Sequence, residues 1–246
     1  MEGRQAVREL LLAGRRRVHE LLVAADLDPS PVVAEILQLA TDDRVPVREV
    51  SRSRLDSQAR TEAPQGVLAR AAPLEEHELD DLASGLVRAT ASGDGPPFLL
   101  LLDGLTDPGN LGALLRSASA AGVTGVVLPR HRAVHVTPTV AKAAAGAIEH
   151  LPMAVVGGLP SAVARLREAG VWVLGLDAEG ARSVWEVPVP EVPVALVVGA
   201  EGAGLSRLVR QRCDEVVAIP MRGPLDSLNA ATAGALACFA VARRRT

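Results

Sequence analysis

The sequence predicts an α/β protein built around a parallel sheet, and three observations support this fold class. From residue 98 onward, near-continuous apolar strands alternate with helical segments, a pattern typical of a parallel sheet covered by helices on both faces. The chain has 246 residues, of which 48% are hydrophobic, enough for one large domain or two small ones. An acidic segment that ends in Gly, Ser and Pro lies at residues 75–95, and we interpret it as a linker.

The residues before this linker predict a small α/β domain, which we place at 1–74. Residues 4–13 and 32–40 have the apolar spacing of helices, whereas 45–50 and 66–71 alternate in the way strands do. Seventy-odd residues are enough for a small independent unit.

The residues after the linker, 96–246, predict a doubly wound domain. Its expected strands are 98–103, 123–129, 171–177, 194–200 and 214–221. Its expected helices are 111–122, 136–147, 159–170, 204–213 and 227–245. In sheets of this kind ligands bind beyond the carboxyl ends of the strands, so the loops that follow strands are where a site is expected.

Composition excludes several classes of protein. No apolar run approaches the roughly 18 to 20 residues of a membrane helix, and the N-terminus has no apolar signal core, so we expect a cytoplasmic protein that does not contact membranes. Cys213 and Cys238 are too few for a disulfide framework and lack zinc-site spacing. We therefore expect a buried, reduced pair and no metal.

Basic and acidic residues nearly balance, at 26 and 29, so the net charge does not decide whether nucleic acid binds. Lys142 is the only lysine and aromatic residues make up 2% of the chain. Few aromatic side chains are therefore available to stack on nucleic-acid bases. Arginine, by contrast, suits phosphate because its planar guanidinium makes bidentate contacts. We attribute the excess of arginine to codon composition rather than to phosphate binding.

The first unusual loop is DGLTDPGNLGALLR, in which Asp103 closes an apolar strand and a turn leads directly into a helix. Asn110 is well placed as the N-cap of that helix. Arg116 points away from the apolar stripe, toward solvent or a cleft. Taken singly, an asparagine here is more readily a cap, and an arginine more readily a solvated surface residue, than part of a site.

The second loop, residues 199–204, reads GAEGAG and joins a buried strand to a helix. Its glycines do not have the spacing of a dinucleotide-binding loop, and they follow a late strand. They nevertheless allow a ligand to lie against the backbone. Glu201 places a carboxylate at a helix entrance, where the helix dipole favours it. Two interpretations of this loop are equally well supported: a tight turn with an acidic helix cap, and a loop that binds a ligand.

The third loop precedes the last helix, and Ser227 and Asn229 stand at the start of that helix. The helix is built from small residues that allow another backbone to approach closely. Such packing serves either a dimer or the core of one chain, and the pattern does not separate the two.

Taken together and in this order, the motifs DPGNLGALLRSA, VVGAEGAGLS with CDEVVAIPM, and SLNAATAG resemble the SpoU/TrmH family of AdoMet-dependent RNA ribose 2′-O-methyltransferases. They span residues 98–245. The N-terminal segments EGRQAVRELL and QGVLARAAPL are similar to the L30e-like substrate-binding domain of ribosomal-RNA members. The resemblance implies a C-terminal trefoil knot that forms the pocket for S-adenosyl-L-methionine (AdoMet), and an active homodimer.

The resemblance also implies which residues form the site. Residues that match the polar active-site set are Asn110, Arg116, Glu201, Ser227 and Asn229. Residues expected to contact or line the cofactor pocket are Gly199, Glu201, Gly202, Ile219, Pro220, Met221, Leu228 and Asn229. The sequence departs from the family pattern after Asn229, where Ala230 and Ala231 replace the usual Val and Ser, which removes one possible hydrogen bond in the pocket.

In this family Arg116 would activate the ribose 2′-hydroxyl that attacks the methyl group. Arginine normally stays protonated near neutral pH, so two hypotheses remain open. Either burial turns its guanidinium into a base, or it positions the ribose phosphate while the proton leaves by another route.

The expected substrate is large-subunit (23S) ribosomal RNA, with guanosine as the modified nucleotide, because of the appended N-terminal domain. A transfer RNA is the runner-up, and a methyltransferase that confers resistance is a third enzymatic alternative. A non-catalytic RNA- or ribosome-binding protein is an alternative of another class, against which the intact polar set argues. A nucleotide-binding dehydrogenase would need a glycine motif after an early strand, and DPGNLG is not one.

Overall fold

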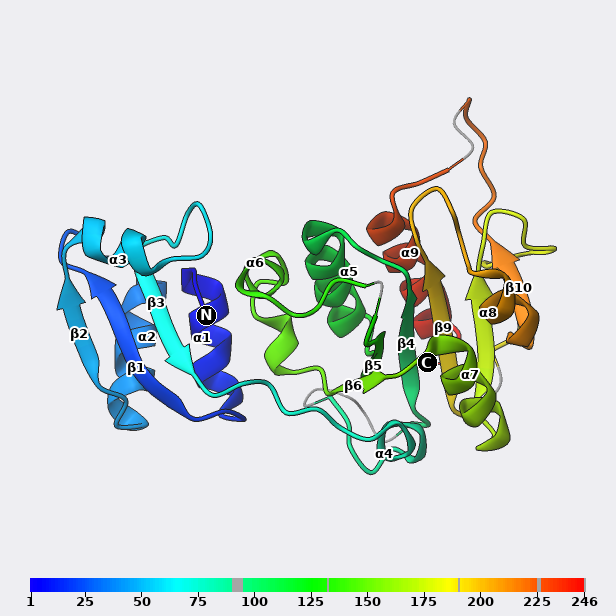
Figure 1. Cartoon of the computed structure of the whole chain (residues 1–246), viewed down its shortest axis with the longest axis horizontal. Helices are drawn as coiled ribbons and strands as arrows, with labels where there is room; N and C mark the ends of the chain where they lie inside the picture. Colours follow the sequence, from blue (N-terminus) through cyan, green and yellow to red (C-terminus); the bar gives the residue numbers. More distant parts are fainter. Residues whose placement is uncertain (90–94, 132, 190, 225–226, 246) are drawn as a thin grey trace. The chain divides into compact units, whose positions relative to one another are not determined.

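The computed structural model describes residues 1–89, 95–131, 133–189, 191–224 and 227–245 (Figure 1). The chain divides into two compact units. Unit 1 comprises Met1–Leu74 and Val136–His150, and unit 2 comprises Glu75–His135 and Leu151–Thr246.

Unit 1 is a small α/β unit with a three-stranded sheet in the order β2-β1-β3. Strand β1 pairs in parallel with β2 and antiparallel with β3. Its elements are α1 (Arg4–Ala13), β1 (Val18–Ala24), α2 (Pro31–Asp42), β2 (Val47–Val50), α3 (Arg52–Gln58), β3 (Val67–Ala71), α6 (Pro138–Ala143) and the 3₁₀ turn η1 (Ala147–Glu149). The α/β class of the N-terminal region is confirmed, although the sequence pattern did not indicate β1 or α3.

A buried ion pair joins the two chain segments of unit 1. Glu149 is 1% exposed, and its carboxylate accepts hydrogen bonds from Arg16 Nε at 3.0 Å and Nη2 at 2.6 Å. Arg16 Nη1 also donates to the carbonyl of Ala72 at 2.8 Å. The expected single helix at 136–147 is thus two short pieces that pack within unit 1, because the chain turns through Ala145 and Gly146, which have positive φ angles.

Unit 2 contains the predicted parallel sheet, several strands of which are labelled in Figure 1. The strand order of this sheet is β6-β5-β4-β9-β7-β10-β8. Its strands pair in parallel throughout the described residues. The strands are β4 (Phe98–Asp103), β5 (Gly125–Pro129), β6 (Met153–Val156), β7 (Trp172–Leu176), β8 (Arg182–Ser183), β9 (Val194–Gly199) and β10 (Glu215–Ala218). Because β4 and β9 are neighbours although other strands intervene in sequence, the strand order reverses beside them, where ligands bind in open α/β sheets.

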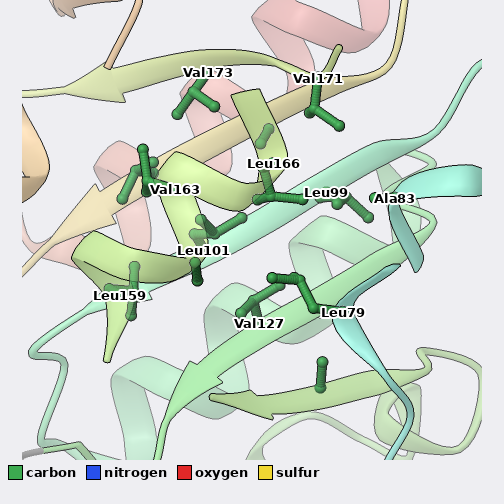
Figure 2. Close-up of a cluster of buried hydrophobic side chains, with 14 of the residues drawn as sticks. Leu79, Ala83, Leu99, Leu101, Val127, Leu159, Val163, Leu166, Val171 and Val173 are labelled. Carbon is green, nitrogen blue, oxygen red and sulfur yellow. The ribbon is translucent and has the colours of Figure 1, made fainter. Parts of the chain in front are cut away.

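Helices cover both faces of this sheet, as the apolar strands predict. They are α4 (Leu79–Ser84), α5 (Pro108–Ala120), α7 (Leu159–Glu168), α8 (Arg207–Arg212) and α9 (Ala230–Arg243). Successive strand residues face opposite sides. Leu99 and Leu101 pack with α4 and α7 in the core cluster drawn in Figure 2. Val198, by contrast, lies against α9 at Gly234.

Helix α9 packs closely on α5, which answers the question that its small residues left open. A Cβ atom at Gly234 would come within 2.7 Å of Leu114 Cδ1, so glycine at this position permits the approach of the two helices. Within this chain, the small residues therefore serve an intramolecular core.

The segment interpreted as a linker, residues 75–95, contains α4. Leu79, Leu82 and Ala83 are buried in the core cluster of unit 2, and His77 donates its backbone N–H to the Met153 carbonyl at 2.9 Å. Residues 90–94 of this segment lie outside the described residues. Residues 225 and 226, in the C-terminal region where the trefoil knot is expected, also lie outside the described residues.

Both cysteines are free thiols, but only Cys238 of the expected buried pair is fully buried, whereas Cys213 is half-buried. Burial raises the pKa of each thiol to about 12. The carboxylate of Asp214 adds to this effect at Cys213. We expect neither thiol to react with iodoacetamide at neutral pH until the protein is denatured, because the thiolate is the reactive form. Since the unfolded thiols ionise near pH 9 and the folded ones do not, the free energy of unfolding should fall above pH 9. Rapid alkylation of the native protein would contradict the burial.

Candidate active site

A pocket lies in unit 2, where β7, β9 and β10 end and α9 begins. Residues from β7, β9 and α9, and from the loops that follow the three strands, form its wall. The lining residues are Leu176, Asp177, Ala178, Val198, Gly199, Ala200, Glu201, Gly202, Gly204, Ile219, Met221, Ser227, Leu228, Ala230 and Ala233. The pocket is therefore at the carboxyl edge of the sheet, as the fold class predicts.

The loop after β9 is folded tightly on itself. Ala200 and Gly204 exchange two backbone hydrogen bonds, of 3.1 and 2.9 Å, and Gly202 and Gly204 have positive φ angles that glycine adopts without strain. A Cβ atom at Gly199 would overlap the backbone of Gly204 and Leu205. The glycines are thus required by the closure of the loop, which presents Glu201 at its exposed tip.

Two strand-terminal carboxylates hold the far end of this loop. Asp177 Oδ2, beyond β7, accepts the backbone N–H of Leu205 at 3.2 Å. Asp103 Oδ2, at the end of β4, accepts the N–H of Ser206 at 2.6 Å. Sequence reasoning noted Asp103 but missed Asp177, which also lines the pocket. The signal was available, because Asp177 closes an apolar strand in the same way as Asp103 does.

The structure joins three of the predicted polar residues by hydrogen bonds. Asn229 Nδ2 donates to Asn110 Oδ1 at 2.9 Å, and Asn110 Nδ2 donates to Glu201 Oε2 at 3.2 Å. Asn229 Oδ1 meanwhile accepts the N–H groups of Ala231 and Thr232 as the N-cap of α9. These three side chains, the polar network, link the starts of α5 and α9 with the loop after β9.

The expectation that Asn110 caps α5 is wrong. The N-cap is Asp107, whose carboxylate accepts the Asn110 N–H at 2.6 Å, and Pro108 occupies the first helical turn. Asn110 is therefore three residues beyond the cap, which leaves its side chain available for the polar network. Glu201, in turn, precedes the N-cap of α8, Ser206, by five positions and is not an acidic cap.

The remaining predicted polar residues lie apart from this network. Arg116 is exposed on α5, and its side chain makes no hydrogen bond or ion pair within the described part of the chain. The burial that the general-base hypothesis requires is therefore absent at Arg116 in this structure. Ser227 is exposed and lines the pocket.

Most residues expected around the cofactor do line the pocket. Among them are Gly199, Gly202, Ile219, Met221 and Leu228. Pro220 and Asn229 are expected there but are not among the lining residues. The Asn229 side chain is engaged by Asn110 and by the start of α9.

The pocket's chemistry fits AdoMet. Its ionisable lining groups among the described residues are two carboxylates, Asp177 and Glu201. These complement a ligand that carries a sulfonium and an ammonium group. Apolar side chains and open glycine backbone form much of the remaining wall, as is usual for an adenosine-sized ligand.

Changing Asn229 should separate its two roles. Asn229→Ala removes the N-cap of α9 and should lower the free energy of unfolding by about 1 kcal/mol. Asn229→Asp keeps an acceptor for the cap but loses the donor to Asn110, so it should retain stability and still lose methyl transfer. Denaturant unfolding and transfer assays on both variants measure this. Full activity in the aspartate variant would show that the Asn229–Asn110 bond is dispensable.

Known proteins match this chain over nearly its whole length. Residues 97–239 match the SpoU rRNA Methylase family, and residues 1–77 match a family described as RNA 2′-O ribose methyltransferase substrate binding. A TrmH family tRNA/rRNA methyltransferase of Bacillus subtilis is 40% identical over 243 residues, covering 99% of this chain and 94% of the relative.

Solved structures agree with these sequence matches. The SpoU methyltransferase AviRb of Streptomyces viridochromogenes, in complex with AdoMet, superposes with a TM-score of 0.79 at 27% identity and covers 100% of this chain and 89% of its own. A structure described as addressing 2-OH methylation of C/U34 on tRNA has a TM-score of 0.54 at 29% identity. It covers 61% of this chain and 97% of its own. Among the described residues, no helix could cross a membrane and no group of three or more His, Cys, Asp and Glu could hold a metal.

Proposed function

Because the chain belongs to the SpoU family of AdoMet-dependent RNA methyltransferases, we propose that it methylates the ribose 2′-hydroxyl of a guanosine in 23S ribosomal RNA. The observation that carries the ribose assignment is the polar network beside the pocket. It places two amides and one carboxylate, Asn229, Asn110 and Glu201, where a ribose hydroxyl can be held. The match of residues 1–77 to a ribose methyltransferase substrate-binding family supports the same reaction.

The N-terminal unit supports ribosomal over transfer RNA as the substrate. The structure concerned with tRNA aligns over 97% of its own length but covers only 61% of this chain. That protein therefore has no counterpart for much of the rest of this chain. AviRb, described as a SpoU methyltransferase, matches all of this chain, and residues 97–239 match a family described as SpoU rRNA Methylase. We therefore assign residues 1–74 to RNA substrate binding, and tRNA is the second candidate because the B. subtilis relative is described as a tRNA/rRNA methyltransferase.

In this proposal the pocket residues bind AdoMet and the polar network binds the ribose. AdoMet supplies an electrophilic methyl group on its sulfonium. Gly199, Gly202 and Leu228 hold the cofactor, with Ile219, Met221 and the backbone near Pro220 beside it. Asn110 and Asn229 orient Glu201, whose carboxylate accepts the hydrogen bond of the 2′-hydroxyl, and Ser227 fixes the rim of the pocket. Arg116 binds the adjacent phosphate and so aligns the hydroxyl for attack.

The proposal also includes a homodimer. Leu236 and Phe239 lie one helical turn apart on α9 and are 38% and 50% exposed, so together they form an apolar patch of the kind that marks interaction surfaces. We expect Leu236→Ser with Phe239→Ser to shift a dimer toward monomer in sedimentation velocity. The control is Leu208→Ser on α8, which removes another exposed leucine. A wild-type monomer, or a dimer that persists in the double variant, would contradict this interface.

The experiment that tests the function is transfer of labelled methyl groups from AdoMet to total RNA taken from cells that lack this protein. We expect label in 23S rRNA, at one nucleotide that nuclease mapping identifies as guanosine. Label in tRNA would overturn the rRNA assignment and retain the chemistry. AdoMet binding without label in any RNA or ribosomal assembly particle would favour a non-catalytic RNA-binding protein.

A further inference from the structure

Unit 1 contains a hollow that the proposed chemistry does not use. It lies between the end of α1, the start of β1 and the turn from α2 to β2. Its polar lining residues are Arg16, Arg17, His19, Asp43 and Arg44, and we call it the arginine hollow. The charge of Arg16 is offset by Glu149, so Arg17 and Arg44 against the one carboxylate of Asp43 leave the lining with a small positive charge.

The three arginines are not equally engaged. Arg16 is held by Glu149 and the Ala72 carbonyl, so it forms part of the wall. Arg17 and Arg44 are exposed, and neither side chain makes a hydrogen bond or ion pair with any residue that the structure describes. Nearby Arg48, by contrast, pairs with Glu20 at 3.6 Å. Two guanidinium groups at the hollow are thus open to a ligand.

The backbone of Arg44 gives an independent reason to look for a ligand. Its φ angle is +56°, in the left-handed region, immediately after Asp43, the C-cap of α2. Glycine is the usual residue at this position, and a non-glycine residue there costs on the order of 1 kcal/mol. The turn is closed by backbone bonds from Arg44 to Thr41 and from Val45 to Ala40, which glycine would make equally well. The arginine side chain therefore contributes nothing that the turn requires.

We propose that the arginine hollow binds the phosphate backbone of RNA, through Arg17 and Arg44. Guanidinium groups bind phosphate oxygens bidentately, and the hollow's lining has no aromatic residue of the Phe, Trp or Tyr type on which a base could stack. Contacts of this kind position an RNA without reading its sequence. The inference rests on the proposed function, since it takes RNA as the ligand, and it adds the residues by which unit 1 holds that RNA.

The test uses the full chain and a short single-stranded RNA of mixed sequence. Arg17→Ala and Arg44→Gly should each weaken binding about tenfold, which is the effect of removing one charge-assisted hydrogen bond. The dependence of log Kd on log salt should become shallower by about 0.7 for each phosphate that the variant no longer binds. Because glycine relieves the strained turn, Arg44→Gly should keep or raise the Tm, so weaker binding cannot be ascribed to unfolding. Arg54→Ala is the matched control, since Arg54 is an exposed arginine of unit 1 on α3, outside the hollow.

The outcomes separate this inference from the proposed function. If the wild type binds and methylates RNA and both variants retain its affinity and salt slope, the arginine hollow is not the phosphate site. If the wild type neither binds nor methylates RNA, the proposed function fails first. Unchanged RNA binding with loss of binding to polyglutamate would assign the hollow to an acidic protein partner and overturn the RNA inference.

Discussion

Replacing Arg116 with alanine should reduce methyl transfer by about 10²- to 10³-fold while AdoMet binding is largely kept. The magnitude is that of removing one preorganised electrostatic contact from an active site. Arg116 is exposed and does not line the pocket, so neither the fold nor the pocket should change. Single-turnover transfer and calorimetric AdoMet binding measure the two effects separately.

Two further variants make the Arg116 experiment decisive. Arg207→Ala removes another exposed arginine from unit 2 and should leave transfer nearly unchanged. Arg116→Lys keeps the charge but loses the planar fork, so partial activity is expected if the side chain binds phosphate. Equal loss of transfer and AdoMet binding in Arg116→Ala would remove Arg116 from the chemistry.

Replacing Gly199 with alanine should lower AdoMet affinity by at least about tenfold and destabilise the protein. The new methyl group would overlap the backbone of Gly204 and Leu205, and such overpacking costs about 1–3 kcal/mol. The loop after β9 would have to open, which displaces Glu201 and Gly202 from the pocket. Calorimetric titration with AdoMet and thermal unfolding report both effects.

Gly157→Ala provides the control for the glycine experiment. Gly157 follows β6, its φ angle is not in the left-handed region, and an added Cβ would meet no described atom within 4 Å. Its AdoMet affinity and Tm should therefore match those of the wild type. Wild-type affinity in Gly199→Ala would show that closure of the loop after β9 is not needed for the pocket.

The parallel sheet could be predicted because its central strands are apolar throughout, and this pattern does not depend on distant contacts. Strand β6, four residues long between a proline and a glycine, was too short to stand out. Strand β1 begins with Val-His-Glu, and only its last four residues are buried, so its sequence does not read as an apolar or alternating strand. Helix α4 was hidden because its acidic residues dominate the segment, although Leu79, Leu82 and Ala83 have helical spacing.

Most residues of the site were predicted from local sequence motifs. The error over the cap of α5 arose because two neighbouring residues, Asp107 and Asn110, could each cap that helix. Asp107 followed by Pro108 is a strong helix start, and giving it weight would have identified the cap of α5 correctly. The contact between Asn110 and Asn229 spans 119 positions, and no local pattern reports such a distance. Asp177 acts on a loop 28 positions away, so only the strand order shows what it holds.

The position of the label within the product nucleotide shows whether the pocket and the polar network transfer a methyl group to a ribose hydroxyl. A 2′-O-methyl group removes the hydroxyl that attacks the neighbouring phosphodiester in alkali. After transfer from labelled AdoMet and complete alkaline hydrolysis of the RNA, we predict label in an alkali-resistant dinucleotide, and loss of that label with Asn110→Ala. Label recovered in mononucleotides, on the base, would contradict the account.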